Sequence, residues 1–372
     1  MQTDGEAAPG FERVLEVFHD NFTDRGELGA SVCVLHRGRV VVDRWDGWID
    51  EARTLPWRRD TIVHTYSTTK PLVATCALLL VDRGALDLDE PVSRQWPEFG
   101  ANGKESVTVR QLLSHQAGLV ALREAVPASE IFDWDAMVDR LAAEAPWWRP
   151  GTAHGEHAYF YGHLVGELVR RVDGRDVARF FREELAEPWG LDFQIGVVPE
   201  DRPRVAPLAG LSSLYPGGLA GEPGSVERDA VTNPPGMLLP EVVNSEAWMA
   251  AAVPAVNGYG TAASVARFYQ VFLAGGVLDG RRVLSRELCQ EATSVQSSGH
   301  DAYLQSSVDW GLGFQIENGS YGHGGLGGSG GYADPKLELA FGYVTNLMAG
   351  HERGNAVADA AETCARESGP SD

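Results

Sequence analysis

The order of hydrophobic and polar positions divides the chain into strand-rich ends and a helical middle. Apolar residues recur at helical spacing over Phe11–Phe22. Two β-rich stretches follow, Ala30–Leu35 and Arg39–Trp45, and the short polar connection at 36–38 predicts a hairpin between them. The first part of the chain therefore predicts one helix and two paired strands.

A nearly continuous apolar segment, Thr69–Gly84, predicts a buried helix. It should begin within Ser67–Pro71, because proline suits the first turn, and Gly84 marks its end. The pattern over Val107–Leu191 is mainly helical, with glycine and proline between the helices. The Gly- and Pro-rich residues Pro203–Pro240 predict a loop.

Strand patterns return after a helix predicted over Ser264–Gly276. Three stretches, 310–317, 320–325 and 337–346, are spaced like an antiparallel meander, and Asn355–Glu367 predicts a closing helix. The economical arrangement is an α/β (α+β) fold, in which an antiparallel sheet formed by both chain ends is flanked by helices and accompanied by a mainly helical second lobe. We expect three segments: 1–66 as the first part of the α/β lobe, 67–245 as the apolar helix and helical lobe, and 246–372 as the second part of the α/β lobe.

Composition places the 372-residue chain among globular proteins and argues against several partners. Hydrophobic residues make up 44% and charged residues 22%, with no low-complexity tract. No apolar run approaches the roughly 20 residues needed to span a bilayer. The opening residues lack the basic and apolar regions of a secretory signal, so we expect a cytoplasmic protein without membrane contact. The net charge of −21 argues against a nucleic-acid partner.

Metal and redox chemistry have little support in the sequence. The four cysteines are far apart and form no CxxC pair, which predicts buried free thiols. His154, Glu156 and His157 lie close together, but they do not provide a histidine pair at helical i, i+4 spacing. We expect no metal and no other cofactor.

Candidate chemistry begins with Ser67 and Lys70, in the stretch HTYSTTKP. Of the 31 basic residues only three are lysines, and lysine, unlike arginine, can lose its proton when it is desolvated. Residues three apart on a helix share a face, so Lys70 can reach the Ser67 hydroxyl. A serine at a helix N-terminus also meets free backbone N–H groups. A helix-capping serine followed by a solvated lysine would give the same short pattern, but the apolar PLVATCALLLV that follows argues against it.

Six stretches resemble the serine β-lactamase and penicillin-binding-protein superfamily, especially its class C, esterase and transacylase branch. They occur in the family's order over roughly residues 28 to 350. They are TYSTTKPLVATCALLLVDRGALDLDEPV, VTVRQLLSHQAGL, WRPGTAHGEHAYFYGHLVGELVRRVDGR, NGYGTAASVARFYQVFLAGG, WGLGF and YGHGGLGGSGGYADPKLELAFGYVTN. The resemblance implies a catalytic Ser67 and Lys70.

The same resemblance implies further site residues. His323, Gly324 and Gly325 take the place of the family's K-T-G or H-x-G triplet on an edge strand beside the active site, where glycines let a substrate lie against the strand. It also implies an oxyanion hole formed by the backbone N–H groups of Ser67 and Leu326.

One position departs from the family's pattern. PGT and LVGEL fix the register on both sides, and Glu156 falls where relatives carry a proton-relaying tyrosine. Three interpretations remain open. Glu156 is a general base; Tyr159 or Tyr161 replaces the missing tyrosine; or the acyl-enzyme forms or hydrolyses poorly. An ion pair with Glu156 would keep Lys70 charged, so the roles would invert, with Glu156 accepting the Ser67 proton and Lys70 assisting as a cation.

Other residues carry weaker signals. Trp148 is a candidate wall of the acyl pocket, although paired tryptophans often only pack. Asn257 is expected to anchor a turn, and the segment containing His115 is expected to be structural.

We therefore expect a serine-dependent acyl-transfer enzyme, an esterase-type hydrolase or transacylase, that acts through a Ser67 acyl-enzyme on a small-molecule ester, thioester or amide. The alternatives are a biosynthetic acyltransferase with poor hydrolysis and a catalytically weakened binding protein. The expected partners are a small-molecule acyl donor and, for a transferase, an amine or alcohol acceptor. The sequence assigns no oligomeric state.

Overall fold

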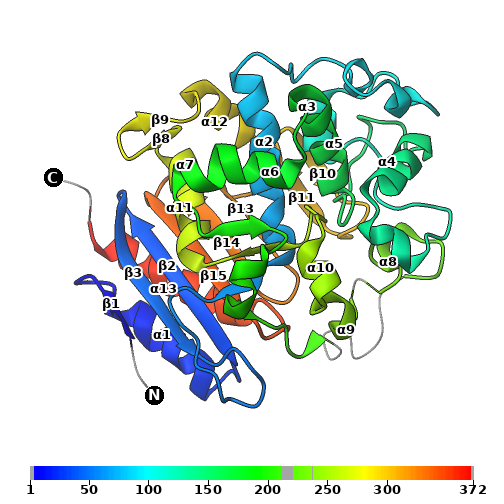
Figure 1. Ribbon diagram of the computed structural model, residues 1–372. Coiled ribbons are helices and arrows are strands. Elements are labelled where there is room, and N and C mark those ends of the chain that lie inside the picture. Colours follow the sequence, from blue (N-terminus) through cyan, green and yellow to red (C-terminus); the bar gives the residue numbers. More distant parts are fainter. Residues whose placement is uncertain (1–3, 212–220, 237, 370–372) are drawn as a thin grey trace.

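The structure, a computed structural model, describes residues 4–211, 221–236 and 238–369. Within these residues the largest sheet has nine strands, all paired antiparallel, in the order β1-β3-β2-β15-β14-β13-β12-β11-β10 (Figure 1). The strands are β1 (Asp4–Ala7), β2 (Gly29–His36), β3 (Arg39–Gly47), β10 (Ser297–His300), β11 (Ser307–Trp310), β12 (Gln315–Glu317), β13 (Ser320–Gly324), β14 (Gly330–Asp334) and β15 (Leu339–Thr345). Strand β15 pairs with β2, so both ends of the chain form one sheet, as predicted.

Helices cover both faces of this sheet. Helices α1 (Glu12–Thr23) and α13 (Glu352–Glu367) pack on one face, where Phe18 and Val357 belong to a buried apolar cluster with residues of β2 and β15 (Figure 1). Helix α11 (Ala262–Leu273) packs against β2, β14 and β15 and belongs to the larger core. The sheet is therefore buried between helices, as expected for this layered architecture.

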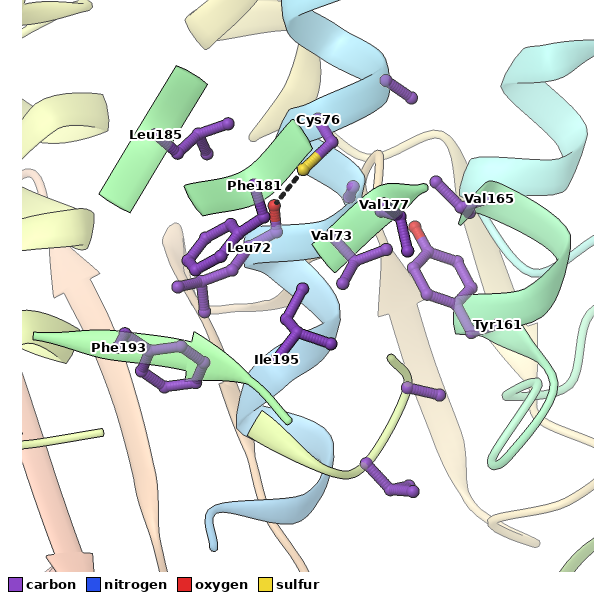
Figure 2. Packing of buried hydrophobic residues seen from close by; sticks show 14 of the residues in the cluster. Leu72, Val73, Cys76, Tyr161, Val165, Val177, Phe181, Leu185, Phe193 and Ile195 are labelled. Carbon is purple, nitrogen blue, oxygen red and sulfur yellow. Dashed lines mark hydrogen bonds between the residues drawn. The ribbon is translucent and has the colours of Figure 1, made fainter. Parts of the chain in front are cut away.

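The predicted apolar helix is present and lies at the centre of the molecule. A 3₁₀ turn, η1 (Tyr66–Thr69), leads into α2 (Lys70–Asp82), and Pro71 occupies its first turn. Because every side is apolar, α2 is buried all round. Figure 2 shows Leu72, Val73 and Cys76 of α2 among side chains of α5, α6 and β5. This burial fixes the position of the residues at the start of α2.

The helical lobe lies beside α2, on the side away from α1 and α13 (Figure 1). Its α-helices are α3 (Val109–Leu113), α4 (Trp134–Ala143), α5 (Tyr161–Asp173), α6 (Val177–Phe181), α7 (Glu187–Trp189), α8 (Val226–Thr232), α9 (Pro240–Val243) and α10 (Glu246–Ala250). The lobe also contains the 3₁₀ segments η2 (Val92–Arg94), η3 (Pro97–Gly100), η4 (Ala128–Phe132) and η6 (Pro199–Arg204) and the π-helical segment η5 (Arg182–Ala186). Helix α12 (Arg286–Ala292) follows α11 in the chain.

A small second sheet supports the start of α2. Its strands, in the order β5-β7-β4-β6, are β5 (Phe193–Ile195), β7 (Gly258–Gly260), β4 (Ile62–His64) and β6 (Val205–Ala206). A two-stranded ribbon, β8 (Val277–Leu278) and β9 (Arg281–Arg282), lies beside α12 (Figure 1). Because β4 leads directly into η1, the small sheet fixes the position of the turn that carries Ser67.

The elements differ from the sequence-based expectations in a few places. The loop predicted over Pro203–Pro240 contains η6, β6 and α8, because short helices can form between glycines and prolines when their apolar faces pack; Ala230 of α8, for example, is buried. Residues 212–220 and 237 of that prediction lie outside the described residues. The sequence analysis did not predict β1, β10, β14 and most of β11 in the large sheet, nor any strand of the small sheet or of the β8–β9 ribbon, since these strands are short or glycine-rich. Among the described helices, none has the length and apolar character that crossing a membrane requires.

Candidate active site

Ser67 lies at a strained turn between β4 and α2. The residue before it, Tyr66, has a φ of 46°, which is unusual for a bulky side chain. The turn is held by β7: the N–H of Thr65 donates to the Gly258 carbonyl at 2.8 Å, and the Gly258 N–H donates to Thr69 Oγ1 at 3.0 Å. Thr69 Oγ1 in turn donates to the Tyr66 carbonyl at 2.6 Å. These bonds fix the backbone that presents Ser67.

Lys70 is fully buried, and three oxygen atoms surround its amine. Its Nζ lies 2.6 Å from Ser67 Oγ, 2.9 Å from Glu156 Oε1 and 3.4 Å from the Ala255 carbonyl oxygen. The turn that presents Ala255 is anchored, as predicted, by Asn257, whose side chain accepts from Val253 N–H and donates to the carbonyls of residues 248 and 251. Three acceptors match the three donors of a lysine ammonium group.

Glu156 stands in the loop before α5, and its side chain is turned inward with 5% of the residue exposed. Its carboxylate pairs with Lys70 at 2.9 Å, and Lys70 in turn donates to Ser67 Oγ. The structure thus brings Glu156 to Ser67 and Lys70, which sequence analysis proposed from a different stretch of the chain.

The buried Lys70–Glu156 pair has shifted pKa values. Burial lowers the pKa of Lys70 from its ordinary 10.5, and the charge of Glu156 opposes this change. For Glu156, burial would raise the pKa, but the charge of Lys70, the nearby His323 and the bonds from Lys70 and Ser67 outweigh it, so the pKa falls below 4.5. Glu156 is therefore ionised at neutral pH and can accept a proton.

His323 lies on β13 beside the same carboxylate. The prediction of an edge strand was wrong: β13 pairs with β12 on one side and β14 on the other, because the short strands β10–β12 extend the sheet beyond it. The Nε2 atom of His323 is 3.8 Å from Glu156 Oε1, and burial lowers the pKa of the ring to about 4, which makes it neutral at pH 7. Its Nδ1 lies 2.7 Å from the Gly324 carbonyl oxygen. Because a carbonyl only accepts, Nδ1 carries the proton and Nε2 presents a lone pair toward the site.

The end of β13 closes against the turn that carries Ser67. A Cβ added to Gly325 would lie 2.0 Å from the Thr65 carbonyl oxygen, and one added to Gly324 would lie 3.0 Å from His351. Only glycine fits at Gly325. Leu326, the predicted second donor of the oxyanion hole, follows directly and lies partly buried against the core. The glycines therefore allow the strand end and the Ser67 turn to approach closely.

The remaining candidates lie at different places. Trp148 packs over Gly155, next to Glu156, and joins a small apolar cluster with Tyr303. Tyr161 lies outside the site: its hydroxyl donates to the Leu113 carbonyl at 3.0 Å, and its ring packs against His115. Tyr159 is buried just before α5.

Two residues that hold Glu156 were not recognised as part of the site from the sequence. The carboxylate of Asp301 and both the ring and the backbone of His115 bond to the Glu156 loop. No local pattern marks Asp301. His115 lies in a recognised motif and has a φ of 62°, but neither its side-chain direction nor its role is visible in the sequence.

No group of three or more His, Cys, Asp or Glu side chains within 4–211, 221–236 and 238–369 is arranged to hold a metal ion. All four cysteines are buried and free, in agreement with the sequence-based prediction.

Comparisons with known proteins show which sequences and solved structures the chain is similar to. The family model described as Beta-lactamase matches residues 12–363. The chain is 38% identical to esterase/beta-lactamase LipL of Mycobacterium tuberculosis, over 92% of this chain and 83% of LipL. Among solved structures, a family VIII carboxylesterase is 37% identical, with a TM-score of 0.89 over 98% of this chain and all of the other. A penicillin-binding-protein homologue from Caulobacter crescentus is 35% identical, with a TM-score of 0.90 and the same coverage.

Proposed function

Since the chain belongs to the beta-lactamase family, we propose that it is a serine esterase that hydrolyses small-molecule carboxylic esters through an acyl-enzyme on Ser67. LipL and the family VIII carboxylesterase, both similar over most of the chain, support an esterase-type serine hydrolase and do not favour the biosynthetic acyltransferase or the weakened binding protein.

One observation carries the proposal: Ser67 Oγ lies 2.6 Å from Lys70 Nζ, and Glu156 Oε1 lies 2.9 Å from the same nitrogen. A hydroxyl with a charged donor on one side and a carboxylate acceptor on the other is arranged for nucleophilic attack. A protonated Lys70 has no lone pair with which to take the Ser67 proton, whereas an ionised Glu156 has one. We assign Glu156 as the base and Lys70 as the cation that stabilises negative charge on Oγ.

The reaction follows from these roles. Glu156 accepts the hydroxyl proton while Ser67 Oγ bonds to the ester carbonyl carbon. The N–H groups of Ser67 and Leu326 bind the oxyanion of the tetrahedral intermediate. The ester C–O bond then breaks, and Glu156 returns the proton to the leaving alkoxide. Water attacks the acyl-enzyme by the same route, Glu156 passes its proton to Ser67 Oγ, and the carboxylic acid leaves.

The substrate is expected to be a neutral ester. The imidazole of His323 is uncharged at neutral pH, and the ammonium group of Lys70 is already paired with Glu156. Neither group offers a spare positive charge to hold a substrate carboxylate.

The experiment is hydrolysis of short-chain p-nitrophenyl esters, together with intact-mass measurement after incubation with a fluorophosphonate. The native enzyme should release p-nitrophenol and gain the mass of one phosphonyl adduct, located on Ser67 by peptide mapping. Ser67→Ala should lose both. A native protein without adduct or turnover would refute the enzyme assignment. Rapid adduct formation with no ester turnover would point instead to an acyl-enzyme that water does not resolve.

A further inference from the structure

The hairpin connecting β10 and β11 reaches across to the loop that carries Glu156. The two segments form an isolated bridge between His154 and Asp301, and the N–H of Ala302 donates to the His154 carbonyl at 3.0 Å. His154 Nδ1 also lies 2.6 Å from Ser297 Oγ. The edge of the large sheet is thus fastened to the helical lobe at the base of the site.

Asp301 is the centre of this junction. Its side chain is fully buried, and its carboxylate accepts hydrogen bonds from four N–H groups. Two come from its own turn, Tyr303 N–H at 2.9 Å and Leu304 N–H at 2.8 Å, both to Oδ1. The others are the Trp310 indole N–H, which donates to Oδ2 at 2.9 Å, and the Glu156 N–H, which is shared between Oδ2 at 3.0 Å and Oδ1 at 3.2 Å. A carboxylate is the side chain that accepts on both oxygens and donates on neither.

His115 holds the same loop from the other side. Its backbone carbonyl accepts from Gly155 N–H at 3.1 Å, and its Nδ1 accepts from His157 N–H at 3.1 Å. Three consecutive backbone N–H groups, those of residues 155, 156 and 157, are therefore bound in turn by His115, Asp301 and His115. Burial, together with the charge of nearby basic groups, lowers the pKa of His115, which keeps Nδ1 available as an acceptor.

We propose that Asp301 and His115 form a two-sided clamp of positioning residues that holds the Glu156 carboxylate against Ser67 and Lys70. The inference rests on the proposed function, in which Glu156 accepts the Ser67 proton. A base must stay within hydrogen-bond reach of the proton that it takes, and a displacement of about 1 Å costs on the order of 10²-fold in rate. The clamp supplies that precision to a loop that belongs to neither a helix nor a strand.

The substitution Asp301→Asn removes the Oδ2 acceptor that Glu156 N–H and the Trp310 indole N–H share. The asparagine oxygen can still accept from Tyr303 and Leu304 and so preserve the turn, but its NH₂ group would face the N–H groups of Glu156 and Trp310. We expect kcat/KM for p-nitrophenyl esters to fall by about 10²-fold. Asp334→Asn is the matched control, because Asp334 caps the β14–β15 turn in the same way, accepting from Lys336 N–H at 2.7 Å and Leu337 N–H at 3.2 Å. This control should keep native kinetics.

A second pair of variants tests the other side of the clamp. His115→Ala removes the acceptor for His157 N–H, whereas the oxygen of His115→Asn can occupy the place of Nδ1, and asparagine tolerates the positive φ. Both variants lose the ring contacts, and the alanine variant should lose more thermal stability because alanine is strained at this φ, so activity is compared at a temperature at which both proteins are folded. Only the alanine variant should lose esterase activity. Equal loss of activity in both would show that His115 acts through packing alone.

Two further measurements separate positioning from general destabilisation. If Asp301 acts only by positioning Glu156, Asp301→Asn should lower kcat/KM by less than threefold in a protein that already carries Glu156→Gln. A further loss of about 10²-fold in that double variant would refute the clamp. Crystal structures of the native and Asp301→Asn proteins should be compared. Glu156 Oε1 should lie within hydrogen-bond distance of Lys70 Nζ in the native protein and beyond it in the variant. An unmoved Glu156 would overturn the inference even if the native protein proved to have no esterase activity, so its failure is distinguishable from that of the proposed function.

Discussion

Glu156 differs chemically from the tyrosine that the sequence comparison leads one to expect at its position. A tyrosine would meet Lys70 as a neutral phenol, whereas a carboxylate brings a negative charge into a buried space. That charge is compensated by Lys70 at 2.9 Å, and Lys70 meets acceptors on all three of its N–H directions. The ion pair is consistent with an exchange of roles, in which the carboxylate becomes the base.

Replacing each member of the pair tests this assignment. Glu156→Gln keeps the shape but removes the acceptor charge, so acylation by an activated ester should slow by about 10²- to 10⁴-fold, measured as the p-nitrophenol burst. Lys70→Met should retain more acylation than Glu156→Gln. The opposite order, with full acylation in Glu156→Gln and none in Lys70→Met, would make Lys70 the base.

The pH dependence of kcat/KM provides a second test at the residue scale. Glu156 must be ionised, so activity should fall as the pH drops through its pKa, below 4.5. Lys70 must be protonated, so activity should also fall as the pH rises through its pKa, below 10.5. Burial also lowers the pKa of His323, to about 4. His323→Gln should therefore keep the acid limb, and Glu156→Gln should flatten it; loss of that limb in His323→Gln would transfer it to the histidine.

Secondary-structure elements set the distance between the two sides of the site. Strand β13 ends against η1, and the contact depends on Gly325, whose missing side chain leaves room for the Thr65 carbonyl. On the other side, β7 holds η1 through Gly258 and so keeps Tyr66 in its strained conformation. The nucleophile turn is thus held between two strands from different sheets.

A single methyl group at Gly325 should separate these elements. Gly325→Ala places Cβ 2.0 Å from the Thr65 oxygen, so the strand end must shift. We expect a loss of about 1–3 kcal/mol in the free energy of unfolding and about 10²-fold in kcat/KM. Gly330→Ala is the control, because its Cβ would find its nearest neighbour at 3.6 Å and should be tolerated. Native activity in Gly325→Ala would argue against an oxyanion hole at this strand end.

At the scale of the whole molecule, a buried ion pair joins the two ends of the chain. Glu27, just after α1, accepts from Arg353 of α13 and from the hydroxyls of Tyr343 and Thr345, the latter at 2.7 Å. Arg353 also donates to the Leu347 carbonyl at 2.7 Å, close to the loop that carries Leu326. The same contacts of Arg353 therefore stabilise the sheet and hold the segment beside the site.

Removing Arg353 should destabilise the protein strongly. Arg353→Met leaves Glu27 buried without its cation, which should lower the free energy of unfolding by about 3–5 kcal/mol, measured by urea denaturation at pH 7. Burial already raises the pKa of Glu27, and Arg353 opposes this. The loss should thus be smallest at acid pH, where Glu27 is protonated, and grow as the pH rises through its folded pKa.

An exposed ion pair on the same helix provides the control. Arg366 pairs with Glu362 at 2.6 Å, but its side chain is 57% exposed. Arg366→Met should cost at most about 1 kcal/mol. Equal losses in the two variants would mean that the buried pair contributes no more than a surface contact.

The sequence by itself determined the features that depend on local spacing. Helical periodicity and Pro71 place Ser67 and Lys70 one turn apart, and the flanking PGT and LVGEL stretches place Glu156. The β patterns at both ends predict a shared antiparallel sheet, because apolar stretches at opposite ends of a chain can bury their faces together. Family membership followed from the same ordered stretches.

Only the tertiary structure decided which groups surround Glu156 and in which direction the tyrosines point. Asp301 is 145 residues from Glu156, and no local pattern relates them. The Tyr161 hydroxyl donates to the Leu113 carbonyl because α5 buries the face that carries Tyr161. Helical periodicity predicts a buried tyrosine there, but it does not show whether the hydroxyl points to Leu113 or to the site. Contacts between distant segments depend on how the sheet edge meets the helical lobe, and that packing is a property of the folded chain.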